Sequence, residues 1–176
     1  VVVATGLSKR QHPATPEGPD VAYSFFQDPE SFKGKNVLVI GGGDGAVENA
    51  ILASEQAASV KLVVRKKLSA RGDFQARLKK TKVVVLEQTD LISFQDNQAV
   101  LKSSSGESTQ AVDRVLVKIG FIKNDSWLPT GNGIGQRSEK LWVIGDVVTD
   151  EDPCILVAMA QGAKTARQIR RHLDHP

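Results

Sequence analysis

The stretch Val37-Leu38-Val39-Ile40-Gly41-Gly42-Gly43-Asp44-Gly45-Ala46-Val47-Glu48 decides the fold of this 176-residue chain. Residues 36–40 begin it with an apolar run that is typical of a buried strand. A glycine-rich turn follows at 41–45, and from Ala46 onward small and apolar residues recur at helical spacing. Residues 59–64 (Ser-Val-Lys-Leu-Val-Val) indicate a second strand. Together these segments predict a parallel βαβ unit.

The spacing Gly41-x-Gly43-x-x-Ala46, between a strand and a helix, is typical of a turn that binds a dinucleotide. Gly41 permits the tight turn, Gly43 lets the backbone approach a pyrophosphate, and Ala46 lets the helix pack closely on the strand. The helix N-terminus offers N–H groups and the positive end of its dipole to the phosphates. The predicted pyrophosphate-binding residues are Gly41, Gly42, Gly43, Asp44, Gly45 and Ala46. A glycine-rich turn without a ligand is the alternative.

The end of the second strand predicts which dinucleotide binds. An NAD site places Asp or Glu about 20 residues after the glycines, to accept a hydrogen bond from the ribose 2′-hydroxyl. This chain has Arg65-Lys66-Lys67 there, with Arg71 nearby, and no acid at the strand end. Arginine can bind a phosphate through two parallel hydrogen bonds. We therefore predict NADP as the cofactor; a solvated basic run is the alternative.

Composition excludes several classes of protein. The net charge of +3 is too small for a general nucleic-acid binder. The single cysteine, Cys154, excludes an internal disulfide framework and agrees with a cytoplasmic location. No apolar run approaches the roughly 20 residues that span a membrane, and no residues have metal-ligand spacing.

The remaining segments complete an α/β fold. We expect a three-layer, Rossmann-like domain whose parallel sheet carries an antiparallel meander. The expected further strands are 1–4, 82–86, two between 91 and 103, 110–119 and 141–144, and a long helix is expected over 154–173.

Four motifs resemble the thioredoxin-reductase-like class of pyridine-nucleotide flavoproteins, and especially its members without a CxxC pair, such as ferredoxin–NADP reductases and bacillithiol-disulfide-reductase-like proteins. They are Ala4-Thr5-Gly6, Phe32–Asp44, Val115-Leu116-Val117-Lys118-Ile119-Gly120-Phe121 and Trp142-Val143-Ile144-Gly145-Asp146-Val147. In that class they mark the exit from the FAD domain, the entry to the NADPH domain, its last strand, and a late FAD motif.

The resemblance implies an NADP-binding domain at 21–124 between partial FAD-domain segments, 1–20 with a linker and 125–176. It adds Gly120, Gly145 and Asp146 to the cofactor-binding residues, with Asp146 near the ribityl or phosphate region of FAD. The first FAD glycine motif of the class is absent, so we expect the chain to start inside the FAD domain. Positions 24–27 read Ser-Phe-Phe-Gln, which excludes a thioredoxin-reductase reaction through an internal CxxC.

The implied function is hydride transfer from NADPH to FAD and on to a disulfide or a protein electron carrier, with a homodimer as the expected assembly. No side chain is a convincing acid, base or nucleophile, so no catalytic residue is predicted. A non-catalytic dinucleotide-binding sensor is the alternative, and a flavin absorbance spectrum separates the two. Two residues keep two interpretations: Glu48 lines the nicotinamide side or is a surface charge, and Cys154 is a redox-active thiol or a packing residue.

Overall fold

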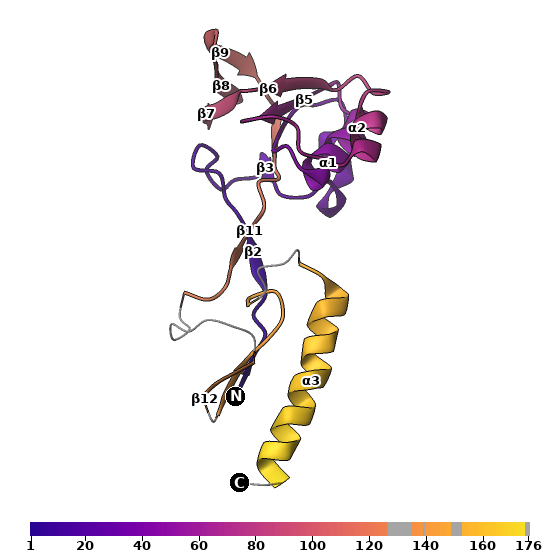
Figure 1. Cartoon of the computed structure of the whole chain (residues 1–176). Coiled ribbons are helices and arrows are strands. Elements are labelled where there is room, and N and C mark those ends of the chain that lie inside the picture. Colours follow the sequence, from indigo (N-terminus) through magenta and orange to yellow (C-terminus); the bar gives the residue numbers. More distant parts are fainter. Residues whose placement is uncertain (127–134, 139, 149–152, 175–176) are drawn as a thin grey trace. The chain divides into compact units, whose positions relative to one another are not determined.

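The computed structural model shown in Figure 1 describes residues 1–126, 135–138, 140–148 and 153–174. The chain forms two compact units: one comprises residues 10–120, and the other comprises residues 1–9 together with 121–176. The sequence predicted these boundaries after residues 20 and 124 instead. Residues 10–20 belong to the larger unit because its strands hold them: Phe94 donates to the carbonyl of Ala14 (3.0 Å) and Val115 to that of Asp20 (2.8 Å).

A parallel five-stranded sheet is the centre of the larger unit, with the order β3-β10-β4-β5-β6. The predicted strands at 36–40 and 59–64 are confirmed as β4 and β5, which pair in parallel from Asn36–Ser59 to Ile40–Val63. The strand bounds are β3 Val21–Ala22, β4 Asn36–Ile40, β5 Ser59–Val64, β6 Val84–Glu87 and β10 Arg114–Val117.

Helices cover one face of this sheet. α1 (Asp44–Ser54) follows the glycine turn. α2 (Gly72–Leu78) lies within the basic segment 66–80, for which the sequence predicted no helix. Two short 3₁₀ helices, η1 (Phe25–Gln27) and η2 (Pro29–Phe32), add Phe25 and Phe32 to the core on this side. Alternate residues of the central strands, such as Val37 and Val39, face these helices, as the period of two requires.

An antiparallel meander covers the other face, so the predicted three-layer fold is confirmed (Figure 1). It consists of β7 (Asp90–Gln95), β8 (Gln98–Ser103) and β9 (Gly106–Ala111). The prediction of one strand at 110–119 was wrong. Val112 donates to Asn97 of the meander, whereas Asp113 donates to Asn36 of the central sheet, so the chain changes sheets between β9 and β10. β10 then pairs with β3 and β4.

The smaller unit contains short strands and one long helix. β1 (Val2–Val3) pairs in parallel with β13 (Leu141–Val143), which also pairs with β12 (Gly135–Ser138), and β2 (Leu7–Lys9) pairs with β11 (Phe121–Lys123). The predicted helix is confirmed as α3 (Ile155–Asp174). The sequence also predicts a loop rich in Gly and Pro over 127–136, most of which lies outside the described residues. No helix in the described ranges is both long and apolar enough to cross a membrane.

Candidate functional site: a basic cleft at the glycine turn

The larger unit contains a cleft of about 640 Å³ at the carboxyl ends of its parallel strands. That volume falls within the range of small-molecule sites. In the sheet, β4 has β5 on one side and β10 on the other, so the strand order reverses direction at β4. The cleft lies at the carboxyl end of β4, and such a topological switch point is where open α/β sheets bind ligands. Its lining residues are Arg10, Ile40, Gly41, Gly42, Gly43, Val63, Val64, Arg65, Lys66, Lys67, Ser69, Thr89, Asp90, Lys118, Ile119 and Gly120.

The glycine turn leaves no room for side chains at its start. Gly41 has a φ of +136°, and a Cβ atom there would lie 2.2 Å from the carbonyl oxygen of Lys118. A Cβ on Gly42 would lie 2.8 Å from Cγ1 of Val64. Around Gly43, in contrast, a Cβ would meet nothing within 4 Å. The turn therefore packs tightly against its neighbouring strands at Gly41 and Gly42, and Gly43 faces open space.

The N-terminus of α1 opens onto this space. Gly43 is the N-cap residue and, having no side chain, makes no side-chain capping bond to the first turn. The first turn of a helix carries N–H groups without partners inside the helix, and it attracts anions. Asn49 connects the first turn of α1 to η1. Its Nδ2 donates to the carbonyl of Gly45 (2.7 Å), and its Oδ1 accepts from the N–H of Phe25 (2.8 Å).

The basic loop after β5 is attached to the glycine turn. The carbonyl oxygen of Gly42 accepts three hydrogen bonds from it, from the N–H groups of Ser69 (2.8 Å) and Ala70 (2.9 Å) and from Ser69 Oγ (3.1 Å). Arg65, Lys66 and Lys67 precede this attachment and line the cleft with exposed side chains. The structure thus brings residues 65–67, from the predicted 2′-phosphate set, and residues 41–43, from the predicted pyrophosphate set, to one cleft.

Arg71 does not line the cleft, although the sequence groups it with the basic loop. Asp44, the first residue of α1, holds it: Arg71 Nε lies 2.7 Å from Asp44 Oδ2, and the Arg71 N–H donates to Asp44 Oδ1 at 2.8 Å. The guanidinium also lies 5.0 Å from the ring centre of Phe74. Four further residues of the larger unit that were named from the sequence do not line the cleft either: Asp44, Gly45, Ala46 and Glu48.

Nine lining residues were not predicted as site residues from the sequence: Arg10, Ile40, Val63, Val64, Ser69, Thr89, Asp90, Lys118 and Ile119. The position of Lys118 at the carboxyl end of a strand was a usable signal, because such ends meet at one edge of a parallel sheet. Arg10 lies in a segment without periodicity and carried no signal. With these residues the cleft has five cationic side chains and one carboxylate, that of Asp90, whose Oδ1 is 3.8 Å from His12 Nε2.

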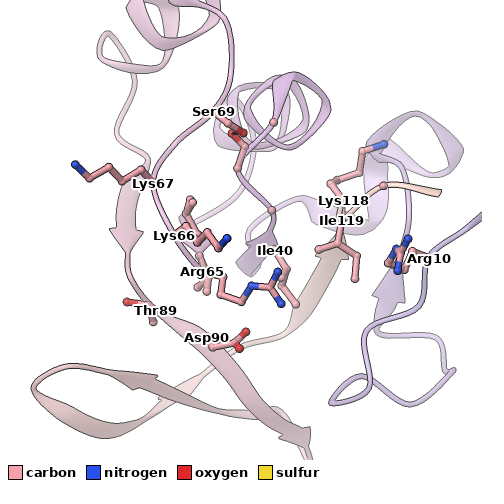
Figure 2. A pocket seen from close by; sticks show the side chains of 16 residues that line it. Arg10, Ile40, Arg65, Lys66, Lys67, Ser69, Thr89, Asp90, Lys118 and Ile119 are labelled. Carbon is pink, nitrogen blue, oxygen red and sulfur yellow. Dashed lines mark hydrogen bonds between the residues drawn. The ribbon is translucent and has the colours of Figure 1, made fainter. Parts of the chain in front are cut away.

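Figure 2 shows the cationic side chains in two groups. Arg65, Lys66 and Lys67 lie on one side of Ile40, and Lys118 and Arg10 lie on the other. Lys118 Nζ donates to the backbone carbonyl of Tyr23 at 3.3 Å. Burial raises the pKa of the Tyr23 phenol, with the charge of Glu17 as a second cause. The cleft is therefore positive along its length and suits a polyanion.

Gly145 and Asp146 belong to the smaller unit and follow β13. Gly145 has a φ of +79°, and its N–H donates to Gln161 Oε1 of α3 at 2.6 Å. Asp146 Oδ1 is buried and has no hydrogen-bond partner. A buried acceptor without a donor is costly, so this oxygen suits a ligand that brings a hydroxyl group. Among the residues that the structure describes, no group of three or more His, Cys, Asp or Glu could hold a metal ion.

Two sequence relatives align with most of the length of this chain. It is 28% identical to one subunit of the alkyl hydroperoxide reductase of Staphylococcus epidermidis over 196 aligned positions, covering 94% of this chain and 38% of that protein. It is 29% identical to the ferredoxin–NADP reductase of Ignicoccus hospitalis over 190 positions, covering 92% of this chain and 60% of that protein. The chain thus spans 38% and 60% of the length of these two relatives.

Solved structures agree on the fold. Thioredoxin reductase from Lactococcus lactis matches with a TM-score of 0.85 at 22% identity, covering 99% of this chain and 66% of that one. Bacillithiol disulfide reductase from Bacillus cereus matches with a TM-score of 0.77 at 18% identity, covering 96% and 60%. The resemblance inferred from the four motifs is confirmed. Because the model of the family described as pyridine nucleotide-disulphide oxidoreductase matches residues 1–150, the chain belongs to that family.

Proposed function

We propose that this chain provides the NADPH site of an FAD-dependent oxidoreductase, which passes hydride from NADPH to the flavin and electrons on to a disulfide or a protein electron carrier. One observation carries the proposal: a single cleft joins the N-terminus of α1 and the glycine turn with the cations of residues 65–67. An NADPH molecule presents a pyrophosphate and a 2′-phosphate, and these two groups match the two parts of the cleft.

The residues divide the binding work between them. The pyrophosphate lies against Gly43 and the first turn of α1, where open space and helix N–H groups meet. The 2′-phosphate lies at the end of β5 and contacts Arg65, which can donate two parallel hydrogen bonds, with Lys66 and Lys67 adding charge. The hydrogen bonds from Ser69 and Ala70 to Gly42 hold these two subsites at a fixed separation. Less ordering is then required when the nucleotide binds.

The smaller unit supplies part of the proposed FAD site. The orphaned Oδ1 of Asp146 fits a flavin that brings a ribityl or ribose hydroxyl as donor. With both cofactors bound, the flavin would supply the hydride-accepting chemistry, and the residues of this chain would contribute position and electrostatics. The names of the relatives support a disulfide, a hydroperoxide-reducing protein or ferredoxin as the destination of the electrons. The homodimer and the cytoplasmic location stay predictions.

Calorimetric titration of the 176-residue chain with NADPH and NADH tests the proposal. We expect NADPH to bind about tenfold or more tightly, since a hydrogen bond to a charged group contributes roughly 1.5–3 kcal/mol. Arg65→Ala weakens NADPH and leaves NADH nearly unchanged. Lys80→Ala is the matched control, because Lys80 is an exposed cation of the same basic segment outside the cleft lining. Equal affinity for the two nucleotides, or tighter NADH, contradicts the assignment.

A further inference from the structure

Lys118 is a cation of the cleft whose backbone and side chain are both held by neighbouring groups. Its backbone follows β10 and is tied to β4, since the Lys118 N–H donates to the carbonyl of Ile40 at 2.8 Å. Its side chain crosses the glycine turn: a Cβ built on Gly45 would lie 3.3 Å from Lys118 Cε and 3.8 Å from Nζ. The bond from Nζ to the carbonyl of Tyr23 holds the ammonium group beside the first turn of α1.

This position differs from that of the predicted 2′-phosphate residues. Arg65, Lys66 and Lys67 extend from the end of β5, whereas Lys118 follows β10 on the opposite side of β4 (Figure 2). A dinucleotide that places its 2′-phosphate at the end of β5 and its pyrophosphate at the turn after β4 extends its nicotinamide half toward β10. The two phosphorus atoms of the pyrophosphate are then not equivalent, because the nicotinamide-side phosphate lies nearer to Lys118.

We propose that Lys118 binds the nicotinamide-side phosphate of the dinucleotide and thereby strengthens the binding of NADPH and NADH to the same extent. The inference rests on the proposed function and adds a subsite to it. An ammonium group carries three N–H donors, so Lys118 can hold the Tyr23 carbonyl and donate to a phosphate oxygen at the same time. The contribution of Arg65 to binding therefore depends on the 2′-phosphate, and that of Lys118 depends on the nicotinamide-side phosphate.

Three ligands separate these two roles. NADPH has both the 2′-phosphate and the nicotinamide-side phosphate, NADH lacks the 2′-phosphate, and 2′,5′-ADP lacks the nicotinamide-side phosphate. Lys118→Met removes the charge and retains an unbranched apolar stem against Gly45. We expect calorimetry to show that this variant binds both NADPH and NADH about tenfold more weakly, because one hydrogen bond from a charged group is lost. Binding of 2′,5′-ADP stays within about twofold and at the same time shows that the variant is folded.

Arg65→Ala gives the crossed pattern, with NADPH and 2′,5′-ADP weakened and NADH retained. Lys118→Arg keeps a cation at the site and restores most of the NADPH and NADH affinity lost in Lys118→Met. The inference is overturned if Lys118→Met leaves NADPH and NADH unchanged, or if 2′,5′-ADP weakens as much as they do. If the wild-type chain binds no NADPH, the proposed function is contradicted as well. If the wild-type chain and Lys118→Met bind NADPH equally well, only the role of Lys118 is contradicted.

Discussion

The two compact units of this chain bury their apolar side chains to very different degrees. Residues 10–120 contain two core clusters, of fifteen and ten buried residues, one on each face of the parallel sheet. The unit of residues 1–9 and 121–176 has one core cluster of three among its described residues, Val3, Val143 and Val147. Its helix α3 exposes Ile155, Leu156 and Met159, whose side chains are 79%, 75% and 66% accessible.

The difference follows from how each unit is layered. In residues 10–120 the central strands lie between helices and a meander, so the side chains on both faces of the sheet are covered. In the smaller unit the described strands are two to four residues long. Thr165 is the buried residue of α3 among its described positions. The cleft is thus built on the unit with the larger core, which suits a site that needs fixed geometry.

The largest expected difference between the units concerns stability. Leu62 is fully buried in β5, and Leu62→Ala should lower the free energy of unfolding by about 2–5 kcal/mol. The same change at Leu156 of α3 should stay within about 0.5 kcal/mol, because the side chain is mostly exposed. Urea unfolding followed by circular dichroism compares the two variants. A large loss for Leu156→Ala would mean that α3 is covered in solution, by a second copy or another chain.

The glycine turn separates folding from binding within residues 10–120. Gly43→Val should weaken NADPH binding by roughly 100-fold or more and leave the circular dichroism spectrum native-like, because a Cβ atom there would have nothing within 4 Å outside its chain neighbours. Gly41→Ala should instead lower stability, by about 1–3 kcal/mol, because of its positive φ and the nearby Lys118 carbonyl. Nucleotide binding that survives in Gly43→Val would show that the turn is structural only.

Cofactor binding offers a second contrast between the units. We expect the 176-residue chain to bind FAD at least about tenfold more weakly than NADPH. The reason is that Asp146 lies in the unit with the small core, and the chain contains a single glycine-rich turn of the dinucleotide type, at Gly41–Ala46. Flavin absorbance after dialysis against FAD measures this. Stoichiometric, tightly bound FAD would show that the smaller unit forms a complete site by itself.

The smallest effect is expected at Arg71. Because Asp44 and the ring of Phe74 hold its guanidinium, Arg71→Ala should weaken NADPH by less than about threefold, compared with about tenfold or more for Arg65→Ala. The exposed Asp44–Arg71 pair should contribute about 0.2–1 kcal/mol to stability. A double-mutant cycle of Asp44→Ala and Arg71→Ala measures that coupling. Equal effects of Arg65→Ala and Arg71→Ala on NADPH would mean that Arg71 leaves Asp44 when the nucleotide binds.

Local signals predicted much of the larger unit. The strands at 36–40 and 59–64, the glycine turn and the three-layer class all follow from hydrophobic periodicity and glycine spacing. The strand expected over 110–119 failed because β9 and β10 are separated by Val112 and Asp113 alone, and both neighbouring segments have strand composition. The change of sheet depends on the hydrogen bonds that these two residues donate to Asn97 and Asn36, which lie far away in the sequence.

The sequence by itself determined the βαβ unit, its glycine turn and the cations that follow β5, because each depends on residues close together in the chain. The tertiary structure decided which cations share the cleft. Arg71 lies six residues after Arg65 but is held by Asp44, whereas Lys118 and Arg10 come from distant segments and line the cleft. Strand order brings the end of β10 beside the end of β4, and such long-range pairing is not encoded in any local pattern.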